Sequence, residues 1–138
     1  MEQFAEYGHA IVSVAAFALI GLILSPISAA RKANEQMEPG AMPKEDYSNL
    51  TYRMCRAHQN AVEMAGLFTA VTIAAILAGA SPFWVNLLAA LFLVSRIIMA
   101  FVHIRGIGKP QQGPRTLLYV LGWACCVILA ILAIFAVF

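Results

Sequence analysis

The clearest chemical pattern in the chain is a run of four polar side chains at helical spacing inside an otherwise apolar stretch. The four residues are Arg53, Arg56, Asn60 and Glu63. At about 100° per residue they fall within roughly 80° of one another on an α-helix, so they form one polar stripe. Guanidinium, amide and carboxylate groups on one face are suited to hold a polar, anionic molecule, and the stripe therefore predicts a binding site. A purely structural polar network is the alternative.

A carboxylate within an apolar helix needs a partner. Glu63 lies ten residues, or about 15 Å, beyond Arg53, at a depth where an unpaired charge costs on the order of 2.5–3.5 kcal/mol. Arg96 is the only basic residue well inside another apolar segment, so we expect Glu63 and Arg96 to lie near each other. The alternative for Arg96 is that its side chain extends to the membrane surface. His103 shares the face of Arg96 and is either a ligand contact or an interfacial residue.

A second pattern, Gly113-Pro114-Arg115-Thr116, opens the last apolar segment. Proline suits the first turn of a helix, and the free N–H groups and dipole of a helix N-terminus attract anions. Arg115 adds a full positive charge there, and Tyr119 follows on the same face. This arrangement favours a site for a carboxylate or a thiolate. An anchoring role for Arg115 at the membrane surface is the alternative.

The elements that position these residues are predicted to be membrane helices. The chain has 138 residues, of which 62% are hydrophobic and 12% charged, a composition too apolar for a soluble domain. Four apolar segments, at 7–30, 50–79, 83–104 and 114–138, are each long enough to span a bilayer. Because the connections are short and carry proline and glycine, we expect one domain, 1–138, folded as an all-α antiparallel bundle of four transmembrane helices.

The basic residues are distributed unevenly along the chain. All of them except Arg96 lie in or beside the first and third connections, whereas the second connection and both termini have none. The positive-inside rule therefore predicts an integral, multi-pass protein with connections one and three in the cytoplasm and both termini on the opposite side. A net charge of +2 agrees with cations gathered at one membrane surface and does not indicate nucleic-acid binding. The residues in question are Arg31, Lys32, Lys44, Arg53, Arg56, Arg105, Lys109 and Arg115.

Three motifs, in order, resemble the MAPEG superfamily, the membrane-associated proteins in eicosanoid and glutathione metabolism. They are Arg53-x-x-Arg56-Ala57-His58-x-Asn60-x-x-Glu63, then Val94-Ser-Arg96, then Gly113-Pro-Arg115-Thr116. The resemblance covers the whole chain and implies a homotrimer in the lipid bilayer that binds glutathione between neighbouring subunits near the cytoplasmic face. It implies glutathione as substrate or cofactor, a lipophilic small molecule as second substrate, and no metal.

The resemblance also implies roles for individual residues. Arg115 would stabilise the glutathione thiolate, since a nearby cation lowers the pKa of a thiol from about 8.5. Thr116 would donate a hydrogen bond to the same sulfur. Met99 and His103 stand where several members carry tyrosines, which leaves the second substrate open. The expected glutathione-binding residues are Arg31, Arg53, Arg56, Asn60, Glu63, Arg96, His103 and Tyr119.

Three functions agree with these patterns. The first is a glutathione transferase or peroxidase that attacks lipophilic electrophiles or hydroperoxides. The second is an isomerase of the prostaglandin E synthase type, which binds glutathione without consuming it. The third, from a different class, is a small four-helix transporter or anion-binding protein that relies on Glu63 as its membrane carboxylate.

Overall fold

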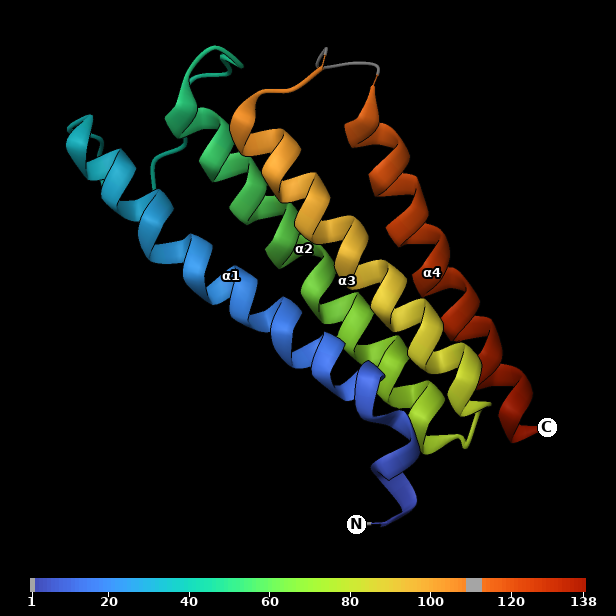
Figure 1. Ribbon diagram of the computed structural model, residues 1–138. Helices are drawn as coiled ribbons and strands as arrows, with labels where there is room; N and C mark the ends of the chain where they lie inside the picture. The colour runs from blue at the N-terminus through green and yellow to red at the C-terminus, as the bar shows by residue number, and fades with distance from the viewer. Residues whose placement is uncertain (1, 109–112) are drawn as a thin grey trace.

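The computed structural model describes residues 2–108 and 113–138, and in these residues all regular structure is helical. A short 3₁₀ segment, Glu2–Tyr7, leads into α1 (Gly8–Asn34), which is followed by α2 (Leu50–Leu77), α3 (Pro82–Arg105) and α4 (Pro114–Val137). Successive helices run in opposite directions (Figure 1). The predicted all-α, four-helix fold class is therefore confirmed. Lys109, one of the predicted cations of the third connection, lies outside the described residues.

All four helices are long and apolar enough to cross a membrane, with a mean hydropathy between 1.7 for α2 and 2.8 for α4. The predicted spans agree with α2, α3 and α4 to within two residues. The first helix continues to Asn34, four residues beyond the predicted end. The lowest hydropathy belongs to α2 because it carries the polar stripe.

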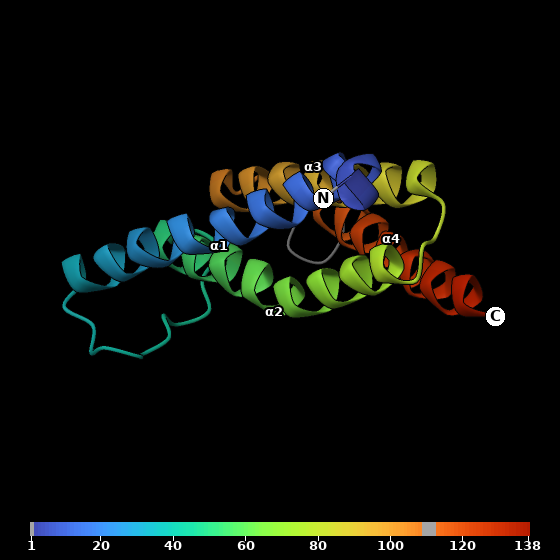
Figure 2. The same cartoon turned by 90° about the horizontal axis from the view of Figure 1, so that it is seen from below.

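The middle of the bundle is formed by α2 and α3, with α1 packed against one side of this pair and α4 against the other (Figures 1 and 2). Three phenylalanines hold α1, α2 and α3 together. Phe68 and Phe92 stack with ring centroids 3.8 Å apart, and Phe17 packs edge-on against both rings. All three are fully buried. Because close-packed aromatic rings allow little sliding, they set the relative height of these helices.

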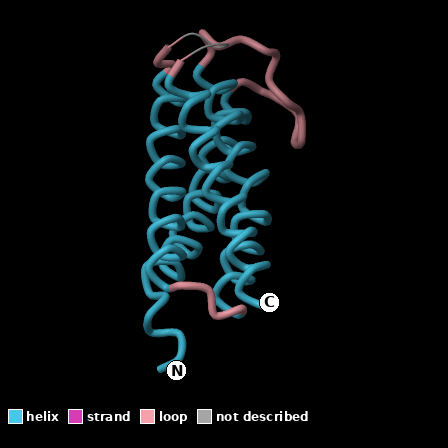
Figure 3. The backbone as a smooth tube through the Cα atoms, turned by 90° about the vertical axis from the view of Figure 1, so that its right-hand side faces the viewer, coloured by secondary structure: helices cyan, strands magenta, loops and turns pink. Residues whose placement is uncertain are grey.

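Both long connections lie at one end of the bundle, and both chain termini lie at the other end (Figures 1 and 3). At the connection end, Asn49 caps the start of α2: its side-chain oxygen accepts hydrogen bonds from the N–H groups of Thr51 and Tyr52. There α3 ends at Gly106, which adopts the left-handed conformation at φ 69°. One end of each of the four helices lies here, and the terminal turns of α2, α3 and α4 carry the predicted site residues Arg53, His103 and Arg115.

Candidate functional site

Arg115 lies at the start of α4 with its guanidinium turned into the protein. Its side chain is only 7% exposed. Nη2 donates a hydrogen bond to the Gly108 carbonyl oxygen at 3.0 Å, and Cζ lies 4.9 Å from the centre of the Tyr47 ring. Within residues 2–108 and 113–138, Nε and Nη1 have no hydrogen-bond partner. A buried cation with two free donors at a helix N-terminus is well suited to bind an anion.

Beside Arg115 is a cavity of about 190 Å³, which we call the outer pocket. Its lining comes from the first connection, from the last turns of α3 and from the first turns of α4. The lining residues are Tyr47, Met99, His103, Arg115, Thr116 and Tyr119. The structure thus brings together four side chains that were predicted from two separate parts of the sequence, namely His103 from α3 and Arg115, Thr116 and Tyr119 from α4.

A second, much smaller cavity lies deeper, among α1, α2 and α3, and we call it the inner cavity. Asn60, Arg96, Met99 and His103 are among its lining residues. At about 10 Å³ it has room for about one water molecule. Because Met99 and His103 also line the outer pocket, they form the wall between the two spaces.

His103 is buried, and neither of its ring nitrogens has a hydrogen-bond partner in the described part of the chain. Its ring centre lies 5.9 Å from that of Tyr47. Buried polar groups are normally hydrogen-bonded, so an unpaired imidazole between two cavities is suited to contact a ligand or a water molecule. This placement agrees with the ligand-contact alternative for His103.

Arg96 is also buried, at 4% exposure, but it faces α4. Its Cζ lies 5.1 Å from the Phe92 ring and 5.2 Å from the Tyr119 ring, and Nη1 donates to the Met99 sulfur at 3.3 Å. Among the described residues, Nε and Nη2 have no partner. The Arg96 side chain therefore stays inside the bundle and does not extend to the membrane surface.

The predicted pairing of Glu63 with Arg96 is wrong for the single chain. Glu63 is exposed on α2, whereas the guanidinium of Arg96 is enclosed by aromatic rings of α3 and α4. The two residues lie on helices whose rotation about their own axes is set by core packing. That rotation turns Glu63 outward and Arg96 toward α4.

Gly122 provides the space that Arg96 occupies, which leads to a first prediction. A Cβ at this position would lie 2.8 Å from both Nε and Nη2 of Arg96. Gly122→Ala is therefore expected to have a free energy of unfolding about 1 kcal/mol lower than that of Gly21→Ala, because the end of the Arg96 side chain must shift, measured by thermal unfolding in detergent. Gly21→Ala is the matched control, because a Cβ there meets nothing within 4 Å. An equal melting temperature for both variants would show that the Arg96 guanidinium does not fill the space beside Gly122.

Arg53 connects the first connection to the end of α3. Its Nε donates to the Ile104 carbonyl oxygen at 3.0 Å, and Nη1 donates to the carbonyl oxygens of Tyr47 at 2.6 Å and Ser48 at 2.9 Å. These contacts give Arg53 a structural role. Its predicted contact with a ligand carboxylate remains a prediction.

The other three residues of the polar stripe, Arg56, Asn60 and Glu63, have different surroundings. Asn60 is half-buried and lines the inner cavity. Arg56 is half-buried and donates to the Gln59 side chain at 2.8 Å. Like Glu63, Arg31 at the end of α1 is exposed. Arg31, Arg56 and Glu63 line neither the outer pocket nor the inner cavity.

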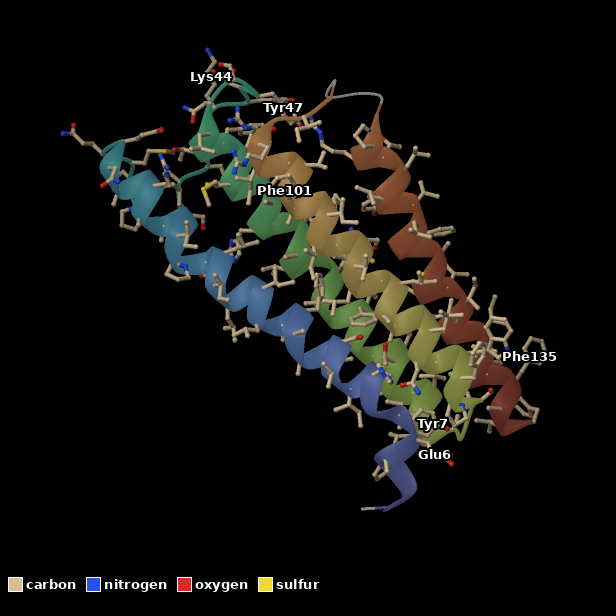
Figure 4. The ribbon with its side chains drawn as sticks, viewed as in Figure 1. Glu6, Tyr7, Lys44, Tyr47, Phe101 and Phe135 are labelled. Atoms are coloured by element: carbon tan, nitrogen blue, oxygen red, sulfur yellow. The ribbon has the colours of Figure 1, made fainter. Side chains whose placement is uncertain are left out.

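Two lining residues of the outer pocket were not among the predicted site residues, namely Tyr47 and Met99. Tyr47 lies at the connection end of the bundle, near the start of α2 and the end of α3 (Figure 4). The sequence signal for Tyr47 is its place two residues before the N-cap of α2. Met99 lies three residues after Arg96 and four before His103, so helical spacing places all three on one face.

Comparison with known proteins gives one match. The model of the MAPEG family matches residues 9–135, which include all lining residues of both cavities. A search among curated proteins found no match.

Proposed function

The chain belongs to the MAPEG family, whose members use glutathione in membranes, and on this basis we propose that it is a membrane glutathione transferase or peroxidase. It would activate the thiol of glutathione for attack on lipophilic electrophiles or hydroperoxides. The observation that carries this proposal is the guanidinium of Arg115, which is buried beside the outer pocket with Nε and Nη1 unpaired in the described chain.

Arg115 would favour the thiolate over the thiol. A cation close to the sulfur lowers the pKa of glutathione's thiol, and the thiol proton is released to water. The dipole of α4, which is positive at the helix N-terminus, also favours the thiolate and lowers the thiol pKa further. Thr116 would donate its hydroxyl hydrogen to the sulfur. The thiolate then forms a C–S bond with an electrophilic carbon as the leaving group departs with its electron pair. With a hydroperoxide, the thiolate attacks the terminal oxygen and the O–O bond breaks, so that a sulfenic acid forms and the alkoxide leaves and takes up a proton from water. A second glutathione then attacks the sulfenic sulfur, which gives the disulfide and water.

The remaining predicted contacts would hold the tripeptide, and their placement supports a site shared between subunits. Arg31, Arg56 and Glu63 do not line the cavities of their own chain. In a homotrimer they would meet the glutathione bound at a neighbour's Arg115. Asn60, Arg96, His103 and Tyr119 line or adjoin the cavities, and with Arg53 they complete the proposed set.

The position of the outer pocket supports the proposed topology. It lies at the end of the bundle that carries both long connections, where the basic residues are concentrated. We assign this end to the cytoplasmic face, where glutathione is supplied, and both termini to the opposite side. The lipophilic substrate would enter from the bilayer.

The proposal is tested by titrating detergent-purified protein with glutathione while the ultraviolet absorbance of the thiolate is recorded. We expect a thiolate band at neutral pH and conjugation of chlorodinitrobenzene or reduction of a lipid hydroperoxide, with glutathione consumed as product forms. Turnover that leaves glutathione unconsumed would overturn the transferase assignment in favour of the isomerase. Proton-coupled efflux that persists without glutathione but is lost in Glu63→Gln would favour the transporter.

A further inference from the structure

We propose that Tyr47 is a positioning residue for Arg115, an inference that rests on the proposed function. Tyr47 comes from the first connection, 68 positions before Arg115 in the sequence, yet its ring centre lies 4.9 Å from Arg115 Cζ. A cation is attracted to the face of an aromatic ring at this distance. The ring of Tyr47 therefore supports the guanidinium that would face the thiolate.

The type of contact matters for the chemistry. A guanidinium carries five N–H donors in its own plane, and attraction to the face of the Tyr47 ring holds the group without an oxygen acceptor that would occupy one of these donors. The Gly108 carbonyl oxygen takes one donor, on Nη2. In the described chain Nε and Nη1 remain free. By contrast, backbone carbonyl groups occupy both Nε and Nη1 of Arg53.

Tyr47 is itself held in place from several sides. Arg53 donates to the carbonyl oxygens of Tyr47 and Ser48 and to that of Ile104 in α3. The Tyr47 ring packs edge-on against Tyr52 of α2, with centroids 5.2 Å apart, and lies 5.9 Å from the ring of His103. The position of Tyr47 is thus fixed by α2 and α3, and through its ring it fixes the first turn of α4.

The turn around Tyr47 has its own hydrogen bonds. The Asp46 carboxylate accepts from the hydroxyl of Ser48 at 2.7 Å and from its N–H at 2.8 Å. These hydrogen bonds lower the pKa of the Asp46 carboxyl group below its usual value, which shows that the turn stabilises the ionised acceptor. Asn49 then caps α2. The backbone of Tyr47 is therefore restrained on both sides by local structure.

The test measures the pKa of bound glutathione from the thiolate absorbance as a function of pH. In Tyr47→Ala we expect this pKa to rise by about one unit, with about tenfold lower kcat/KM at neutral pH, because the guanidinium loses its orientation. Tyr47→Phe keeps the ring and is expected to stay within about twofold of the wild type. If Tyr47→Ala fails to fold, Tyr47→Leu, which fills the site without an aromatic face, is expected to show the same shift.

Phe101→Ala provides the matched control. Phe101 forms the same kind of contact with Arg105, 5.4 Å from Cζ, at the end of α3 and outside both cavities, so its removal should leave the pH profile unchanged. An unchanged profile in Tyr47→Ala, or equal shifts in Tyr47→Ala and Tyr47→Phe, would overturn the role of the ring. A thiolate band missing from the wild type would overturn the proposed function itself, and the role of Tyr47 with it.

Discussion

Arg115→Ala is expected to lose the glutathione thiolate and to lower kcat/KM for conjugation by about 100- to 1000-fold, the usual effect of removing one preorganised donor from a developing or stabilised anion. The reason is geometric. The Arg115 guanidinium lines the outer pocket, it is 7% exposed, and Nε and Nη1 are unpaired in the described chain. The measurements are the thiolate absorbance and steady-state kinetics of chlorodinitrobenzene conjugation in detergent.

Arg105→Ala is the control for this prediction. It removes the same charge at the same end of the bundle, but Arg105 is exposed and stacks on Phe101, so activity should change little. Arg115→Lys should recover part of the thiolate, because it keeps the charge and loses the planar arrangement of donors. Wild-type turnover in Arg115→Ala would remove this residue from the mechanism.

Arg96→Met is expected to separate ligand binding from stability. A buried guanidinium without a carboxylate in the described chain is expensive to desolvate, and replacing buried charges by apolar residues of similar size often stabilises a protein by about 1–4 kcal/mol. The ligand-free variant should therefore melt at a higher temperature than the wild type. The increase in melting temperature that glutathione causes in the wild type should be largely lost, since Arg96 contacts Met99 and Tyr119, which both line the outer pocket.

Arg105→Met makes the same chemical change on the same helix at an exposed position, and it should leave both melting temperatures near those of the wild type. A fall in the melting temperature of ligand-free Arg96→Met would show that the contacts of Arg96 with the Phe92 and Tyr119 rings stabilise the bundle. In that case these ring contacts would explain why Arg96 is buried, without a contribution from ligand binding.

Much of this fold could be predicted from the order of residues because the bilayer constrains it strongly. A helix must satisfy its own backbone hydrogen bonds in lipid and must be long enough to cross it. Four apolar segments separated by proline and glycine therefore predict four helices with ends accurate to a few residues. The place of Arg115 in the first turn of α4 also follows, because Pro114 before it starts the helix.

The sequence by itself thus determined the helices, their alternating direction and the residue types that each brings to the connection end. The tertiary structure alone decided which groups meet. Helical spacing placed Arg53 and Glu63 on one stripe, but core packing turns Glu63 outward, encloses Arg96 against Gly122, and brings Tyr47 onto Arg115. Spacing within a helix follows from local geometry, whereas the rotation of each helix and the path of a connection depend on packing between segments far apart in the chain.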